Sequence, residues 1–215
     1  MSKKTWIEAV VTVIVVVSIA ILWATKSKES GVIKFGATLP LSGDAAAWGK
    51  NTQEGIDLAV EEINSAGGVL GRKIMIIYED TKALPKEGVN AYQKLITVDH
   101  VQSIIDDSVS SVTLAMAPMA KKDGVVILST GATAPKISEA GIFRIWNSDA
   151  YEGEVSADYA FNTLGLRSIA ILYINNEYGK GLEEVFRTQF TKRGGLVPIS
   201  EAFAQSATNM KTQLT

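Results

Sequence analysis

The sequence predicts an α/β fold made of two doubly wound lobes with parallel sheets. Short β-prone runs alternate with helical patterns of about ten to fifteen residues, and this alternation requires parallel strands joined by right-handed crossovers. The alternation pauses near residue 147 and then restarts, which indicates a second lobe. The 215 residues are 47% apolar and 20% charged, which permits a sizeable core and excludes a disordered or fibrous chain.

The first 30 residues predict a membrane anchor or signal segment. Residues 6–24 are rich in Val and Ile and are flanked by two lysines on each side. Their length matches the roughly 30 Å of hydrocarbon that a helix crosses at about 1.5 Å per residue. An uncleaved anchor is favoured over a cleaved signal peptide, whose apolar core is normally shorter. We therefore expect residues 1–30 to lie in a membrane and the rest of the chain to be extracytoplasmic.

The first α/β lobe is expected at residues 31–147. Its strands are predicted at residues 32–38, 73–79, 101–105, 125–128 and 143–146. Helices are predicted between them from Gly49 to a left-handed cap at Gly67-Gly68, over residues 86–98, and around residues 112–120. Pro118 should kink or shorten the last of these helices, because proline removes a backbone donor.

The second lobe, residues 148–215, is expected to be incomplete. A helix is predicted over residues 150–164, a strand over residues 168–174, a helix ending at Gly194-Gly195, and a strand over residues 196–200. A polar tail follows to Thr215. Two strands are fewer than a doubly wound lobe normally needs to cover its helices, so the second lobe is expected to be truncated.

Four loops at the carboxyl ends of predicted strands point to a binding site for a small molecule. They are residues 42–49, 106–111, 129–135 and 175–181, all rich in small or polar side chains. In a parallel sheet such loops share one edge, which is where open sheets bind ligands. The candidate site residues in these loops are Trp48, Ser110, Ser111, Gly131, Ala132, Thr133 and Tyr178.

The expected chemistry of these loops suits a zwitterionic solute. Ser110 opens a helix, where free N–H groups attract an anion such as a carboxylate, and Thr133 with nearby carbonyls can bind an ammonium or the other carboxylate oxygen. Trp48 and Tyr178 offer flat apolar walls. Each residue also has a plain structural interpretation: Ser110 as a helix N-cap, Thr133 as a turn residue, and both aromatics as packing residues. Only their recurrence at one edge favours the site.

Other function classes find little support in the sequence. The net charge of -2 provides no basic field, so we expect no nucleic-acid partner. The chain has no cysteine, and His100 is the single histidine, so we expect neither a metal site nor a cofactor. A serine triad would need His100 as its base, but no serine lies in a glycine-flanked elbow; we therefore do not expect an enzyme.

Several short motifs, in their order and spacing, resemble a known family. These are Ile33-Lys34-Phe35-Gly36, Leu41-Ser42-Gly43-Asp44, Trp48-Gly49, Ala59-Val60-Glu61-Glu62-Ile63-Asn64, Gly67-Gly68, Ser110-Ser111, Pro118, Ala132-Thr133-Ala134-Pro135 and Tyr178-Gly179-Lys180-Gly181. From about Ile33 to the last residue the chain resembles the extracytoplasmic solute-binding proteins of branched-chain amino acid ABC importers. These leucine-binding proteins have the type I periplasmic binding protein fold.

The resemblance implies a two-lobed, hinged clamp that captures an amino acid or similar small solute and delivers it to an ABC permease. It implies that Ser110 and Thr133 hold the ligand's carboxylate and ammonium, with the backbone at Gly131 assisting. It also implies that Trp48 and Tyr178 line the pocket, Tyr178 from the second lobe. A membrane-anchored sensory ectodomain of the same fold is the alternative.

The acidic pair Asp106-Asp107 departs from the family pattern. Relatives commonly carry glycine or apolar residues where this chain has Asp106-Asp107. The pair either favours a cationic solute or belongs to a solvated loop, and we favour the solvated loop.

Overall fold

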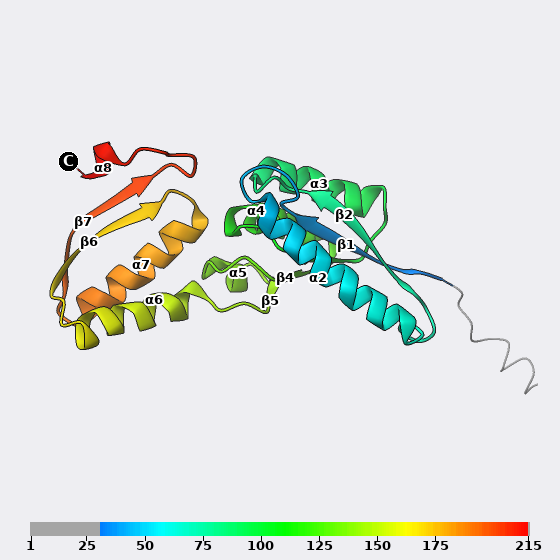
Figure 1. Ribbon diagram of the computed structural model, residues 1–215, viewed down its shortest axis with the longest axis horizontal. Coiled ribbons are helices and arrows are strands. Elements are labelled where there is room, and N and C mark those ends of the chain that lie inside the picture. Colours follow the sequence, from blue (N-terminus) through cyan, green and yellow to red (C-terminus); the bar gives the residue numbers. More distant parts are fainter. Residues whose placement is uncertain (1–30, 215) are drawn as a thin grey trace, which may run out of the picture. The chain divides into compact units, whose positions relative to one another are not determined.

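The computed structural model describes residues 31–214, which form two separate β-sheets (Figure 1). The expected membrane segment lies outside these described residues. Within residues 31–214, no helix has the length and apolar character needed to cross a bilayer. The alternation of strands and helices predicted from the sequence is confirmed, whereas the predicted boundary between lobes at residue 147 stays a prediction.

The first sheet and its connections occupy the larger part of the chain (Figure 1). The elements are β1 (Ile33–Leu39), α2 (Ala46–Ser65), β2 (Ile74–Asp80), α3 (Pro85–Thr97), β3 (Ser103–Asp106), α4 (Ser110–Asp123), β4 (Val126–Ser129), α5 (Lys136–Glu139) and β5 (Phe143–Arg144). The remaining elements are α6 (Asp149–Asp158), the π-helix η1 (Tyr159–Thr163), β6 (Ser168–Ile174), α7 (Glu177–Lys192), β7 (Leu196–Phe203) and α8 (Lys211–Leu214).

The strand order of the first sheet explains where a ligand would bind. The order is β2-β1-β3-β4-β5, and β3 pairs in parallel with both β1 and β4. The chain turns to one side of β1 for β2 and to the other side for β3, so the order reverses between β1 and β3. In open parallel sheets the crevice outside the carboxyl ends of strands at such a reversal is the usual ligand site.

The main apolar core packs helices α3 and α4 against the central strands. Its largest fully buried members include Tyr92 and Leu95 of α3, Met116 of α4, and Ile104 and Ile127 of the sheet. Proline within α4 does not end that helix, contrary to the shortening considered above. The helix continues to Asp123 and ends at Gly124, which adopts a left-handed backbone with φ of 69°.

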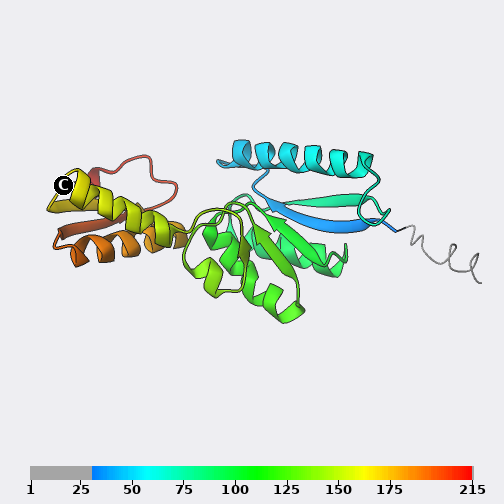
Figure 2. The ribbon, with the colours of Figure 1, turned by 90° about the horizontal axis from the view of Figure 1, so that it is seen from below.

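The second sheet contains β6 and β7, which are parallel, with α7 connecting them. Helices α6 and α7 lie side by side in Figure 1 and Figure 2, in agreement with their packing contacts. A small apolar cluster fills this part of the chain, with the buried ring of Phe190 stacked on Phe186 at 5.7 Å between centroids. The ring of Phe161 meets Phe190 edge-on at 5.8 Å.

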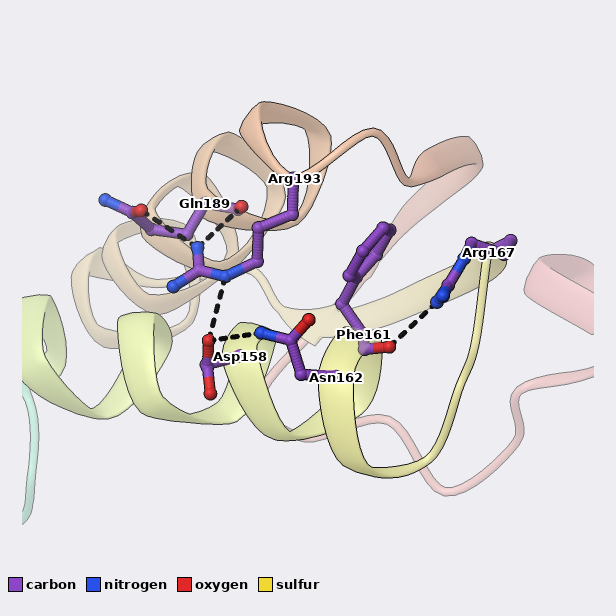
Figure 3. Close-up of polar contacts among 6 residues, drawn as sticks. All are labelled: Asp158, Phe161, Asn162, Arg167, Gln189 and Arg193. Carbon is purple, nitrogen blue, oxygen red and sulfur yellow. Dashed lines mark hydrogen bonds and ion pairs between the residues drawn. The ribbon is translucent and has the colours of Figure 1, made fainter.

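The predicted helix over residues 150–164 begins and ends as expected, but its last turn is a π-helix. Figure 3 shows the polar contacts around this wider turn. Asp158 Oδ1 accepts hydrogen bonds from Asn162 Nδ2 at 2.7 Å and from Arg193 Nε at 3.2 Å (Figure 3). Arg167 donates to the carbonyl of Phe161 at 2.8 Å, and its guanidinium carbon lies 3.9 Å from the centre of that ring.

The described residues divide into two compact units, residues 31–33 with 59–75 and residues 34–58 with 76–214. In the smaller unit, the side-chain amide of Asn64 pairs with the backbone of Ile74. It donates to the Ile74 carbonyl at 2.8 Å and accepts from the Ile74 amide at 2.7 Å. Gly67 and Gly68 have φ of 107° and 77°, which confirms the left-handed cap predicted for this pair.

Candidate functional site

A cavity of about 450 Å³ lies within the larger unit and brings together most of the candidate site residues. Five of the seven predicted residues line it: Trp48, Ser110, Gly131, Thr133 and Tyr178. The other lining residues are Val109, Thr130, Trp146, Ile174, Asn176 and Gln205. The lining residues come from the loops that follow β3, β4 and β6, from the ends of neighbouring elements and, for Trp48, from the first turn of α2.

Two of the predicted site residues do not line this cavity. Ser111 is half-buried on α4, and Ala132 is completely buried in the core of the first sheet. Both are sequence neighbours of lining residues. In a loop or at the start of a helix, consecutive side chains point in different directions, so adjacency in the sequence does not place them together.

Ser110 is the first residue of α4, but it does not act as the N-cap. The N-cap is Val109, which has no side-chain cap, so the N-cap interpretation of Ser110 is wrong. The Ser110 hydroxyl oxygen instead accepts hydrogen bonds from the amides of Thr133 and Ala134, each at 3.1 Å. Because this oxygen already accepts two N–H groups, the hydroxyl proton is what Ser110 can offer to a ligand. It can donate to an anion beside the positive end of α4.

Thr133 is held through all of its polar groups. Its amide donates to Ser110, and its carbonyl accepts from the Asp149 amide at 2.9 Å and from an Arg144 guanidinium nitrogen at 2.9 Å. Its hydroxyl donates to Asp149 Oδ2 at 3.1 Å. The loop after β4 is therefore fixed against the start of α4 on one side and the start of α6 on the other.

Gly131 forms a wall of the cavity where a larger residue would not fit. An added Cβ would lie 2.5 Å from Asp107 Oδ1 and 2.7 Å from an edge carbon of Trp48. The Asp107 carboxylate lies behind this wall and accepts hydrogen bonds from Thr130, at 2.8 Å, and from Thr52 of α2. Through these two hydrogen bonds the Asp107 carboxylate links α2, which carries Trp48, to the loop that follows β4.

The acidic pair Asp106-Asp107 is buried, so the expectation of a solvated loop is wrong. The two residues are 0% and 2% exposed. Asp106 accepts hydrogen bonds from Thr38 at 2.8 Å and from Thr113 at 2.5 Å. Burial raises the pKa of Asp106 to about 6, although these hydroxyl groups act in the opposite direction. The carboxylates are structural groups beneath the site, because neither lines the cavity.

The opposite wall of the cavity comes from the second sheet and α7. Asn176 caps α7 by accepting from the Gly179 amide at 2.9 Å, and its own amide donates to Gln205 at 3.2 Å. Tyr178 lies in the first turn of α7 with 37% of its surface exposed. Burial raises the pKa of Tyr178, and the nearby carboxylates of Glu152 and Asp149 raise it further. The phenol hydroxyl of Tyr178 therefore stays neutral over the physiological pH range.

The sequence analysis missed six of the lining residues, for different reasons. Val109, Thr130 and Asn176 lie inside three of the predicted loops. Ile174 and Trp146 are the last residues of predicted strands, so a wider reading of the strand ends would have included all five. Gln205 lies in the segment that the sequence presented only as a polar tail. No sequence signal marks it, because it reaches the cavity through the unexpected extension of β7 to Phe203.

None of the described residues that line the cavity carries a formal charge. Trp48, Trp146 and Tyr178 provide aromatic surface, and the polar groups are hydroxyls and amides. Among residues 31–214, no group of three or more His, Cys, Asp or Glu side chains is placed to hold a metal ion. The arrangement can bind a small solute that is neutral overall and has an apolar body.

One family model and several known proteins match this chain. A family model described as periplasmic binding protein matches residues 32–215. The Leu/Ile/Val-binding protein homolog 3 of Brucella melitensis is 28% identical over 190 residues, which cover 84% of this chain and 51% of that protein.

Two solved structures are similar over most of this chain. The leucine binding protein LivK of Thermotoga maritima has a TM-score of 0.78 at 28% identity, covering 85% of this chain and 52% of its own. LivJ of Streptococcus pneumoniae, a branched-chain amino acid transporter substrate binding protein in complex with isoleucine, has a TM-score of 0.75 at 29% identity. That match covers 86% of this chain and 53% of LivJ. The chain thus spans about half the length of these proteins.

Proposed function

Because this chain belongs to the periplasmic binding protein family, we propose that it captures a branched-chain amino acid or a similar small solute for an ABC importer. Membership of this family implies an extracytoplasmic location. Of the relatives named above, one is a Leu/Ile/Val-binding protein homolog and one is a leucine binding protein. The third is a branched-chain amino acid transporter substrate binding protein whose structure holds isoleucine. The proposed role is binding and delivery to a permease in the membrane, without chemical turnover of the solute.

One observation supports the proposal most directly. The cavity combines a donor hydroxyl at the start of a helix with uncharged, largely aromatic walls. We propose that Ser110 and the free amides of the first turn of α4 bind the carboxylate of the solute. Thr133 and the backbone at Gly131 bind its ammonium group, while Trp48 and Tyr178 enclose its apolar side chain. The cavity volume lies within the range of pockets for small ligands.

Calorimetry on the full 215-residue chain tests this proposal. The probes are L-leucine, L-isoleucine and L-valine. Replacing Ser110 or Thr133 by alanine should weaken binding by about 1–3 kcal/mol, because a charged group of the solute loses its hydrogen-bond partner. Thr97→Ala, which removes an exposed hydroxyl on α3, is the matched control and should bind like the wild type. Unchanged affinity in both site variants would remove these residues from the site.

We also propose that residues 1–30 anchor the protein in a membrane. The apolar run at residues 6–24, with lysines on both sides, supports this, and it lies outside the described residues. Fractionation of cells that express the full chain tests the anchor. The protein should stay with the membrane pellet after washing with high salt and alkaline buffer. Its release as a soluble, shortened protein would instead indicate a cleaved signal peptide.

A further inference from the structure

The hydroxyl group of Thr133 is the point where the cavity meets a buried carboxylate. Thr133 lines the cavity, and its Oγ1 donates to Asp149 Oδ2 at 3.1 Å. A second hydrogen bond, from the Asp149 amide to the Thr133 carbonyl at 2.9 Å, fixes the two residues relative to each other. Asp149 itself does not line the cavity, so any effect it has on a ligand must pass through Thr133 or through its charge.

The burial of Asp149 is costly and requires a compensating reason. The residue is 0% exposed, and within the part of the chain that the structure describes its other oxygen, Oδ1, accepts no hydrogen bond. A buried, unpaired carboxylate oxygen normally destabilises the folded state. Asp149 lies in the first turn of α6, where its attraction to the positive end of the helix dipole offsets part of this cost. A neutral residue that caps the helix would stabilise the start of α6 as well.

The direction of the Thr133 hydrogen bond determines what the cavity can recognise. A threonine hydroxyl has one proton and two lone pairs. While Asp149 is ionised it can only accept, so the Thr133 proton points to Asp149 and the lone pairs remain for the ligand. The Ser110 hydroxyl has the opposite role: its oxygen already accepts hydrogen bonds from two amides, so it offers its proton to the ligand. The two hydroxyls therefore offer one acceptor and one donor, 23 residues apart in sequence but joined through the Thr133 amide.

We propose that Asp149 is a positioning and specificity-determining residue, which holds Thr133 as a hydrogen-bond acceptor so that the cavity selects carboxylates that also carry an amino group. This inference rests on the proposed function, since it concerns the same cavity. It predicts discrimination between an amino acid and the analogue that lacks only the ammonium group. The negative charge of Asp149 acts in the same direction, because it favours a cation on the far side of Thr133.

The preference should weaken in acid. Asp149 faces Glu152 on the same helix, Arg144 of β5, and Tyr178 of α7. Burial raises the pKa of Asp149 to about 6; the Thr133 hydrogen bond and Arg144 act against this rise, and Glu152 adds to it. Below that pH the protonated carboxyl can donate to Thr133, which then turns its own proton toward the ligand. The loss of the acceptor favours a carboxylate without an ammonium group.

A matched pair of ligands provides the test. L-leucine and 4-methylpentanoate have the same carbon skeleton and carboxylate, and only leucine carries an ammonium group. Calorimetry on the full chain at about pH 7.5 should show a preference for leucine of about 10- to 100-fold, the range for a hydrogen bond to a charged group. The preference should fall markedly at about pH 5.

Variants test whether Asp149 itself is responsible for the preference for leucine. Asp149→Ala should reduce the preference about tenfold, and Asp149→Asn, which keeps an acceptor oxygen, should retain part of it while losing the pH dependence. In a Thr133→Val background the further change Asp149→Asn should have a smaller effect than in the wild type, because the hydroxyl is gone and only the charge of Asp149 can still act on the ligand. Glu154→Gln removes the same charge from an exposed position on α6 and should leave the preference unchanged. A wild-type preference in Asp149→Ala, or wild-type pH dependence in Asp149→Asn, would overturn the inference.

A second readout needs no ligand and keeps this inference distinct from the proposed function. If the wild type binds neither leucine nor its analogue, the proposed function fails, yet the Thr133–Asp149 interaction can still be tested. The carboxyl carbon of labelled Asp149 is followed by NMR as a function of pH. Thr133→Val should raise its titration midpoint, because the hydroxyl stabilises the ionised form. An unchanged midpoint would show that Thr133 does not donate to Asp149, and the inference would be wrong.

Discussion

Replacing Gly131 by alanine tests how closely the cavity wall is packed. The new methyl group would lie 2.5 Å from Asp107 Oδ1 and 2.7 Å from an edge carbon of Trp48, both closer than side-chain carbons tolerate. The carboxylate has little room to move, because it is 2% exposed and accepts a hydrogen bond from Thr130 at 2.8 Å. The ring of Trp48 is 41% exposed, so we expect the ring to move.

The size of the effect follows from the cost of one misplaced methyl group. Forcing an extra methyl group into a packed site costs about 1–3 kcal/mol. For a chain of this length, each kcal/mol lowers Tm by about 2–4 °C. The backbone of Gly131 does not have a positive φ, so the penalty is steric and not a matter of backbone strain. Because Trp48 lines the cavity, its displacement should also weaken leucine binding, by about tenfold or about 1.4 kcal/mol.

Thermal unfolding and calorimetry measure the two effects on the same samples. Gly55→Ala is the matched control, because a Cβ there meets nothing within 4 Å and the residue lies inside α2. Alanine in a helix interior is favoured over glycine by up to about 1 kcal/mol, so this variant should be slightly more stable than the wild type. If Gly131→Ala retains both the wild-type Tm and the wild-type affinity, the close contact between Gly131, Asp107 and Trp48 is refuted.

Three further predictions concern stability. Burial raises the pKa of Asp106 to about 6, above its value near 3.9 in the unfolded chain. Between these two values the native state binds one more proton than the unfolded state. The free energy of unfolding should therefore fall as the pH rises from about 4 to 6. Urea denaturation at about pH 5 and 7 checks this, and Asp106→Asn should reduce the difference. Phe190→Ala removes a fully buried ring and should destabilise the protein by about 3–5 kcal/mol in the same assay. Arg193→Gln breaks a partly exposed ion pair with Asp158, whose side chain is about half exposed, and should cost about 1 kcal/mol. An effect equal to that of Phe190→Ala would contradict the assigned core.

Local patterns were enough to predict the alternation of elements. The strand at residues 168–174 has the predicted bounds, and β1 to β4 differ from prediction by one or two residues. These strands are short apolar runs between turn residues, which is a local signal. The π-turn at residues 159–163 could not be predicted from local patterns, and its residue Phe161 packs against Phe190, far along the chain.

The candidate site was only partly predictable for a related reason. Trp48, Ser110 and Thr133 follow strand ends, and parallel pairing alone brings strand ends to one edge. Asp149 has no such position. Its importance comes from the meeting of the α6 start with the loop after β4, and the sequence shows only an acidic residue in a helical first turn. The burial of Asp106 and Asp107 was likewise hidden, because the threonines that satisfy them come from four separate segments.

The strand order also determines when parts of the chain can assemble. Strand β1 pairs with β3, and the Thr38–Asp106 hydrogen bond between them joins residues 68 positions apart. Strands β6 and β7 are separated only by α7 and its turns, so their pairing closes a shorter loop. Closing a long loop costs more entropy and slows association. We therefore expect β6–α7–β7 to assemble rapidly and the pairing of β1 with β3, beneath the cavity, to form late in folding. Newly made chains would therefore complete this cavity only after most of their secondary structure is already present.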